Sequence, residues 1–103
     1  MTSLAYRSEG SGEPVIFVHG WGLNSGVWKE QLKSLSDEFR IIAVDLPGHG
    51  RTEPKDEKMT VKGAADCLRG LADELALENV HLVGWSLGAH VVCRAALLPG
   101  FDT

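Results

Sequence analysis

Three short apolar runs, separated by stretches with the residue spacing of helices, constrain the fold more than any other feature. Residues 15–18 and 41–44 are apolar throughout, and the third run begins at Val80, includes His81 and ends at Val83. A strand that is covered on both faces in a parallel sheet reads as a continuous apolar run, whereas a half-exposed strand alternates. Such strands alternating with helices form right-handed strand–helix–strand units. The sequence therefore predicts the α/β class, with a mostly parallel sheet and flanking helices.

The segments around these runs predict three helices and one further strand. Apolar residues recur at helical spacing over residues 27–39, and Thr60 is a suitable N-cap for an apolar stripe that continues to residue 75. Residues 89–98 are expected to form the last helix, which the following Pro99-Gly100 pair would end. Residues 4–8 form a candidate first strand, followed by a turn rich in Gly, Ser and Pro.

Size and charge limit the classes of partner. The chain has 103 residues, 44% of them hydrophobic, which is enough for one domain, and we assign residues 1–103 to it. The formal net charge of −4 gives no basic field that would hold nucleic acid or an anionic membrane surface. The sequence has no run of 18 apolar residues and no apolar segment of a secretory signal, which predicts a cytoplasmic protein. Neither cysteine has a partner at metal-ligand spacing.

A G-x-S-x-G motif, residues 84–88, stands where the third run turns into the last predicted helix. The motif alone is weak evidence, but at a junction between a strand and a helix its serine and glycines have a structural purpose. A tight strand-to-helix turn would strain Ser86 and expose its hydroxyl, and a Cβ at Gly84 or Gly88 would clash with nearby backbone. The serine would also lie at a helix N-terminus, where free N–H groups favour negative charge. Ser86 is therefore the candidate nucleophile.

The negative charge that develops on attack needs hydrogen-bond donors, and two backbone amides are candidates. One is the N–H of Leu87, which directly follows the serine. The other is in His19-Gly20-Trp21-Gly22, whose glycines would let the loop after the first run fold back and direct the Trp21 N–H at the same oxygen. Both loops follow the carboxyl ends of strands, where doubly wound sheets place their sites. Each such donor is typically worth about 2.7–4 kcal/mol in the transition state.

Three motifs, in order, resemble the N-terminal half of the α/β-hydrolase family over residues 4–98. They are His19-Gly20-Trp21-Gly22, Asp45-Leu46-Pro47-Gly48-His49-Gly50-Arg51-Thr52 and Gly84-Trp85-Ser86-Leu87-Gly88. Within the family, residues 19–24 together with the serine motif are most similar to the pimeloyl-acyl-carrier-protein methyl ester carboxylesterases. The resemblance implies a partial α/β-hydrolase fold, truncated after the helix that follows the serine, as the N-terminal half of a single domain.

The resemblance also implies roles for individual residues. Ser86 would be the nucleophile, and Trp21 and Leu87 would supply the oxyanion-hole amides, with the Trp21 ring touching the substrate. The family needs no metal and no organic cofactor. Relatives that dehalogenate or open epoxides have Asp at the serine position, which argues against both reactions for this chain.

The other histidines and aromatic residues are expected to be structural. The resemblance implies that His19 shapes the oxyanion loop, while His49 belongs to a turn in which Asp45 bonds loop amides. The histidines expected in packing or surface positions are His81 and His90. The aromatic residues expected in the core are Trp28 and Trp85.

Two members of a catalytic triad are missing from this pattern. In the family the acid and the histidine follow later strands, and here only residues 87–103 follow Ser86. Removal of triad members typically costs about 10⁴–10⁶ in kcat, so we expect the chain by itself to have little or no esterase activity. The strand from Val80 to Val83 would be an exposed apolar edge, which predicts self-association through it.

The sequence leaves three functions open. The leading hypothesis is a hydrolase of carboxylic esters that acts through an acyl-enzyme on Ser86, with small ester or acyl substrates that include acyl groups linked to an acyl carrier protein. The second is a thioesterase, carbon–carbon bond hydrolase or cofactor-free haloperoxidase of the same fold. The third is a catalytically dead fragment that acts as a binding or assembly module.

Overall fold

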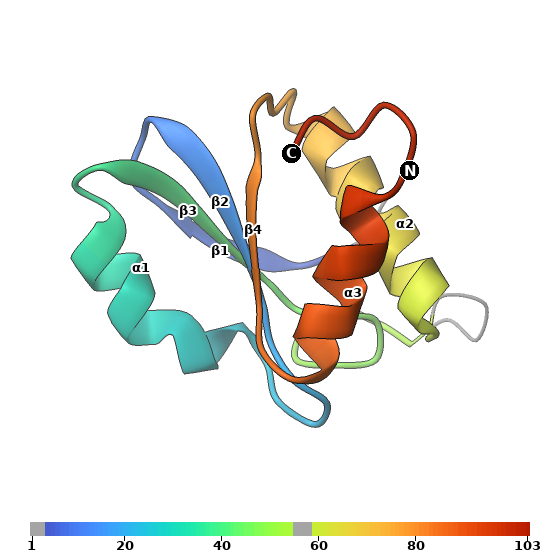
Figure 1. The fold of residues 1–103 in the computed structure, drawn as a ribbon. Coiled ribbons are helices and arrows are strands. Elements are labelled where there is room, and N and C mark those ends of the chain that lie inside the picture. The colour runs from blue at the N-terminus through green and yellow to red at the C-terminus, as the bar shows by residue number, and fades with distance from the viewer. Residues whose placement is uncertain (1–3, 55–58) are drawn as a thin grey trace.

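A four-stranded sheet forms the centre of the molecule, with its strands in the order β1-β3-β2-β4 (Figure 1). The computed structural model describes residues 4–54 and 59–103. The strands are β1 (Tyr6–Glu9), β2 (Glu13–Val18), β3 (Phe39–Val44) and β4 (His81–Gly84). β2 pairs in parallel with both β3 and β4, whereas β1 pairs antiparallel with β3. The prediction of a mostly parallel sheet is confirmed.

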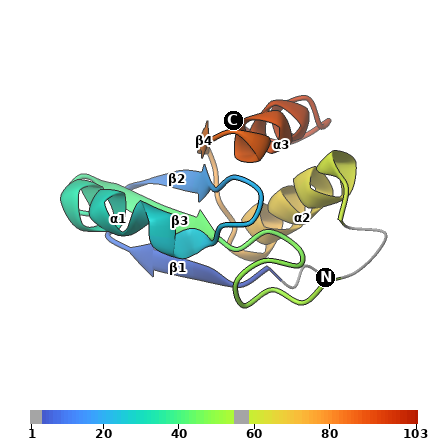
Figure 2. The same cartoon turned by 90° about the horizontal axis from the view of Figure 1, so that it is seen from below.

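Alternate side chains of the two central strands enter two separate hydrophobic clusters. One cluster, shared with helices α2 (Val61–Glu74) and α3 (Leu87–Ala96), contains Ile16, Val18, Ile42 and Val44. The other, shared with helix α1 (Lys29–Leu35), contains Val15, Phe17, Ile41 and Ala43. Figures 1 and 2 show α1 on one side of the sheet and the other two helices on the opposite side. Because both faces are covered, neither strand has a polar face, which accounts for the continuous apolar runs.

The helix expected over residues 27–39 is shorter in the structure. A 3₁₀ turn, η1 (Ser25–Trp28), leads into α1, and Phe39 is already the first residue of β3. Phe39 pairs with Glu13 in the parallel ladder, so the hydrogen bonds of the sheet outweigh the helical spacing of its side chain. The Phe39 ring still packs against the same cluster as α1, which explains why its spacing matched a helix.

The two helices on the other face match the sequence more closely. Thr60 caps α2, because its Oγ1 accepts a hydrogen bond from Gly63 N–H at 2.9 Å. Helix α3 begins at Leu87, two residues before the expected start, and it ends before Pro99. The two helices pack against each other over the sheet (Figure 1). None of the helices in the described ranges is long and apolar enough to cross a membrane.

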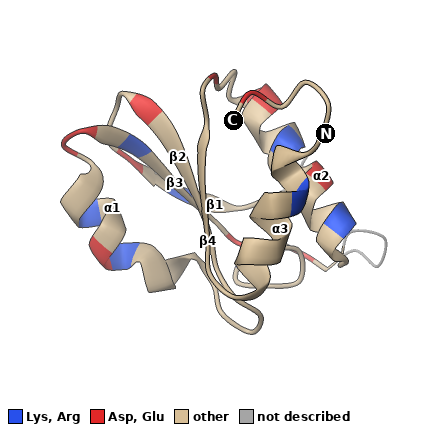
Figure 3. Cartoon of the chain, in the orientation of Figure 1, with Lys and Arg blue, Asp and Glu red and all other residues tan. Residues whose placement is uncertain are grey.

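Charged residues are found on α1, on α2, at Arg94 of α3 and along β2 and β3 (Figure 3). Residues 19–28 and 84–93, which follow those two strands, contain no Lys, Arg, Asp or Glu. The segments that follow β2 and β4 are therefore built from neutral side chains and backbone dipoles.

β4 forms an open edge of the sheet. Within the part of the chain that the structure describes, β4 pairs with β2 alone. Val83 on this strand is 38% exposed, and the strand has no proline or lysine that would protect an edge.

Candidate active site

Ser86 occupies the sharp turn between β4 and α3. Its φ of 58° and ψ of −117° lie where residues other than glycine are rarely found, and such a conformation costs of order 1–3 kcal/mol. The residue is exposed, and its side chain makes no capping hydrogen bond to α3. The turn thus presents the hydroxyl at the carboxyl edge of the sheet.

The glycines on either side of Ser86 are required by the close approach of the backbone. A Cβ on Gly84 would overlap the carbonyl oxygen of Gly88, and a Cβ on Gly88 would overlap the carbonyl oxygen of Val18. The same Val18 oxygen accepts a hydrogen bond from Trp85 N–H at 3.1 Å. The start of α3 therefore lies against the end of β2, which brings the serine next to the loop that follows β2.

That loop, from His19 to Gly22, lies beside the serine. A Cβ added to Gly20 would lie 3.3 Å from the Cβ of Ser86, so glycine keeps the space between the two loops open. Within the described residues, the Trp21 and Leu87 amides donate no hydrogen bond. Both N–H groups are therefore free to donate a hydrogen bond.

His19 is fully buried and its ring nitrogens bond only to backbone. Nε2 accepts the Leu46 N–H at 3.1 Å, and Nδ1 lies 2.7 Å from the Gly20 carbonyl oxygen. This pattern assigns the proton to Nδ1, which donates to Gly20. Burial lowers the pKa of His19 and outweighs the Gly20 hydrogen bond, which raises it. His19 thus joins the loops that follow β2 and β3.

Asp45 organises the turn after β3. Its carboxylate accepts the Ser25 N–H at 2.7 Å and the Arg51 N–H at 3.3 Å, and its carbonyl accepts the Thr52 hydroxyl at 2.7 Å. Burial by itself would raise the pKa of Asp45, but the hydrogen bonds from Ser25 and Arg51 and the Arg51 charge lower it overall. The carboxylate bonds loop amides, as the sequence suggested.

His49 makes a contact between the loops that the sequence did not reveal. Its Nε2 accepts the N–H of Gly22 at 2.9 Å, and its Nδ1 lies 3.0 Å from the Pro47 carbonyl oxygen. The sequence places His49 only in a turn, because nothing in the motif shows that the ring reaches a residue 27 positions away.

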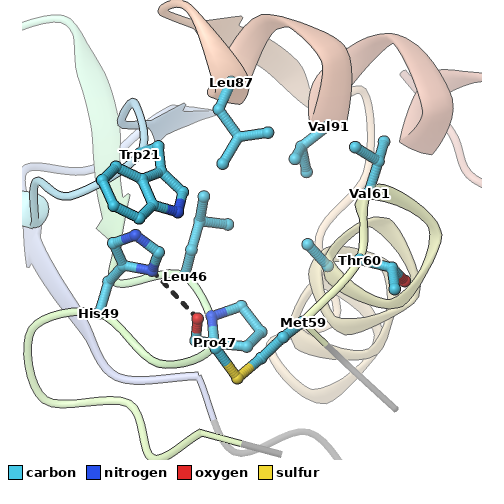
Figure 4. A pocket seen from close by; sticks show the side chains of 10 residues that line it. Trp21, Leu46, Pro47, His49, Met59, Thr60, Val61, Leu87 and Val91 are labelled. Atoms are coloured by element: carbon cyan, nitrogen blue, oxygen red, sulfur yellow. Dashed lines mark hydrogen bonds between the residues drawn. The ribbon is translucent and has the colours of Figure 1, made fainter. Parts of the chain in front are cut away.

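An apolar pocket of about 300 Å³ opens beside these loops. Figure 4 shows Trp21 and His49 on one side of it, Leu87 and Val91 of α3 above, and the start of α2 opposite. Its lining consists of Trp21, Leu46, Pro47, His49, Met59, Thr60, Val61, Ala64, Leu87 and Val91. Two of these residues, Trp21 and Leu87, are the ones whose amides are available next to the serine, so the pocket adjoins that position.

The remaining candidates are two histidines and two tryptophans. His81 forms an exposed pair with Glu13, with 3.0 Å between Nε2 and Oε2, and His90 is exposed on α3. Trp28 packs against Phe17, as expected of a core aromatic residue. The same expectation is wrong for Trp85, which is 54% exposed, because the turn at Ser86 directs it away from both clusters.

Within the described ranges, no hydrogen bond links a histidine to the Ser86 hydroxyl. No group of three His, Cys, Asp or Glu side chains in those ranges could hold a metal ion. The features next to Ser86 that could serve a reaction are therefore its hydroxyl, backbone amides and an apolar pocket.

Comparisons with known proteins give the family of the chain. Residues 13–99 match the family described as alpha/beta hydrolase fold. The chain is 37% identical over 98 residues to the pimeloyl-[acyl-carrier protein] methyl ester esterase of Methylococcus capsulatus, covering 94% of this chain and 37% of that protein. It is 41% identical over 98 residues to the corresponding esterase of Pseudoalteromonas atlantica, covering 94% of this chain and 36% of that protein. The chain thus spans little more than a third of the length of these curated relatives.

A solved structure agrees with these matches. The chain superimposes on a thermophilic esterase from Thermogutta terrifontis with a TM-score of 0.86 and 38% sequence identity, covering 90% of this chain and 35% of that one. The strand–turn–helix at Ser86, the glycine-rich loop beside it and the matched residues lead to one assignment. The chain belongs to the α/β-hydrolase family.

Proposed function

We propose that this chain provides the nucleophile and the oxyanion-binding amides of a carboxylic ester hydrolase. The observation that supports the proposal best is the strained, exposed Ser86, whose Cβ lies against Gly20 of the neighbouring loop. Strained residues persist where the surrounding structure holds them, and they cluster at active sites.

In the proposed reaction, the Oγ of Ser86 attacks the carbonyl carbon of the ester. The carbonyl oxygen becomes negatively charged and accepts hydrogen bonds from the Trp21 and Leu87 amides. The bond to the alcohol oxygen then breaks, and the alcohol leaves with the proton that the serine gave up. Water attacks the resulting acyl-serine, which releases the acid and restores the hydroxyl.

The serine proton needs a base, and the two histidines in the loops at this edge already make other hydrogen bonds. His19 and His49 bond to backbone groups through both ring nitrogens. Without a base, an oxyanion hole still gives roughly 10³–10⁴ over water. We therefore infer little or no activity for the chain by itself.

The relatives and the pocket suggest the class of substrate. The two curated relatives are named as esterases of a methyl ester on an acyl carrier protein. The apolar pocket of about 300 Å³ beside Trp21 and Leu87 would accept an alkyl part of such a substrate. We also propose that residues 1–103 correspond to the N-terminal half of one α/β-hydrolase domain.

A fluorophosphonate probe tests the proposal, because the serine oxygen displaces fluoride from phosphorus and the phosphonyl oxygen of the adduct takes the place of the ester carbonyl oxygen. We expect labelling of the chain that disappears in Ser86→Ala and persists in Ser34→Ala, since Ser34 is an exposed serine on α1. An absence of labelling at Ser86 would contradict an assembled nucleophile and favour the binding or assembly module.

A further inference from the structure

The loop that follows β2 is linked to the loop that follows β3 by three hydrogen bonds between a side chain and a backbone amide. His19 Nε2 accepts from Leu46, Asp45 Oδ1 accepts from Ser25, and His49 Nε2 accepts from Gly22. The first two bonds are buried and lie at the base of the loops. The third lies at the exposed tip, next to Trp21.

The hydrogen bonds of His49 define its ring orientation. Nε2 accepts an N–H, so it has no proton, and the proton on Nδ1 is donated to the Pro47 carbonyl at 3.0 Å (Figure 4). The ring also lies near two other rings, with centroid separations of 5.1 Å from His19 and 6.4 Å from Trp21. Both nitrogens are engaged, so His49 acts on the neighbouring loop through position rather than through proton transfer.

The hydrogen bond of Gly22 acts on the backbone at Trp21. The Gly22 N–H belongs to the peptide unit that follows Trp21, whereas the Trp21 N–H belongs to the unit that precedes it, and the two units meet at the Trp21 α-carbon. A bond from Gly22 to His49 holds the first unit and so limits the rotation of the second. The turn is closed by Leu23 N–H, which donates to the Gly20 carbonyl at 3.2 Å. Gly22 itself has a φ of 80°, and a Cβ there would touch nothing within 4 Å. Glycine is therefore needed for its backbone conformation, which leaves the turn free to move unless a hydrogen bond holds it.

We propose that His49 is a positioning residue for the oxyanion hole, holding the Gly22 amide so that the Trp21 N–H keeps its direction at the Ser86 turn. The catalytic role of His49 in this inference rests on the proposed function. The N–H···N hydrogen bond between Gly22 and His49 can be measured independently of any activity.

Two substitutions separate the two nitrogens of the ring. His49→Gln places an acceptor near the position of Nε2 and retains the bond to Gly22, whereas His49→Asn keeps a donor near the position of Nδ1 and loses that bond. We expect His49→Asn to accelerate hydrogen exchange of the Gly22 amide by roughly 2–10-fold, the effect of one lost hydrogen bond. His49→Gln should restore exchange close to the rate of the unmodified chain.

A measurement on the unmodified chain keeps the test valid if a variant does not fold. In ¹⁵N-labelled protein, we expect a scalar coupling between the Gly22 amide nitrogen and His49 Nε2 across the hydrogen bond. Absence of this coupling, or equal Gly22 exchange in the unmodified chain and His49→Asn, overturns the proposal.

Fluorophosphonate labelling then connects the bond to the serine. We expect His49→Asn to slow labelling of Ser86 and His49→Gln to recover it, and equal labelling rates in the two variants overturn the catalytic role of His49. If the unmodified chain is not labelled at all, the proposed function fails, and with it the catalytic role of His49. The coupling and exchange data still decide whether His49 positions Gly22.

Discussion

The α-carbon of Gly88 lies against the carbonyl oxygen of Val18, so close that a Cβ on Gly88 would overlap that oxygen. This contact places the start of α3 on the end of β2, and it brings Ser86 to the loop that contains Gly20. The second glycine of the serine motif therefore serves the packing between a helix and a neighbouring strand.

Gly88→Ala should destabilise the chain, because neither backbone can move without breaking β2–β4 pairing. We expect the free energy of unfolding to fall by about 1–3 kcal/mol, the usual cost of overpacking. Urea denaturation checks this value. Gly20→Ala is the control, since its nearest atoms would lie at 3.3 Å or more, and it should cost less. Equal stability of Gly88→Ala and the unmodified chain would contradict the overlap.

Ser86→Gly should stabilise the chain while removing its reactivity. Glycine adopts the φ of 58° without a Cβ penalty, and relief of the strain should raise the free energy of unfolding by about 1 kcal/mol. Ser86→Ala is the control, because it removes the hydroxyl but keeps the Cβ. If chemical denaturation shows glycine no more stable than alanine at this position, the turn does not strain the serine.

The stability of the chain should rise with pH through the range in which His19 is protonated in the unfolded chain but not in the folded chain. The pKa of His19 is lowered from 6.5 by burial, so the unfolded chain binds more protons between the folded pKa and 6.5. The stabilisation is fully present above 6.5 and is lost as the pH falls from there toward the folded pKa, by up to about 1.4 kcal/mol per pH unit.

His19→Asn isolates this contribution, because the other histidines are present in both proteins. Urea unfolding between about pH 5 and 8, the range in which histidine changes charge, should give a steeper pH dependence for the unmodified chain than for the variant. Identical slopes would show that His19 is as accessible to protons in the folded state as in the unfolded one. If the variant does not fold, NMR titration of the His19 ring measures the same shift.

The open edge of β4 should mediate self-association. Its outer backbone groups have no partner strand within residues 4–54 and 59–103, and such an edge pairs readily with another chain. We expect Val83→Lys to shift the chain toward a monomer in sedimentation velocity, because a charge opposes edge pairing. Val27→Lys is a matched control, since Val27 is 40% exposed and Val83 is 38% exposed. A monomer at high concentration before any substitution would refute the idea.

Local patterns were enough to predict several elements of this fold. Thr60 caps α2 because its hydroxyl bonds an amide three residues ahead, and the runs within β2 and β3 are apolar because helices cover both faces. The strand-to-helix turn at Ser86 was likewise visible in the order of glycine, serine and glycine. These features depend on residues within a few positions of one another.

Other features were decided by the tertiary structure. Phe39 had helical spacing but joined β3, and Trp85 was expected in the core but is exposed. In both cases the position of a neighbouring strand or turn outweighed the local signal.

The sequence by itself determined the α/β class and the place of Ser86, because both follow from short-range periodicity and turn chemistry. Only the tertiary structure decided the contacts of His49 with Gly22 and of Asp45 with Ser25, which join residues 27 and 20 positions apart. The parallel register that pairs Val18 with Val44 ends β2 and β3 at the same edge. The loops that follow them meet there, and no pattern within either loop encodes that register.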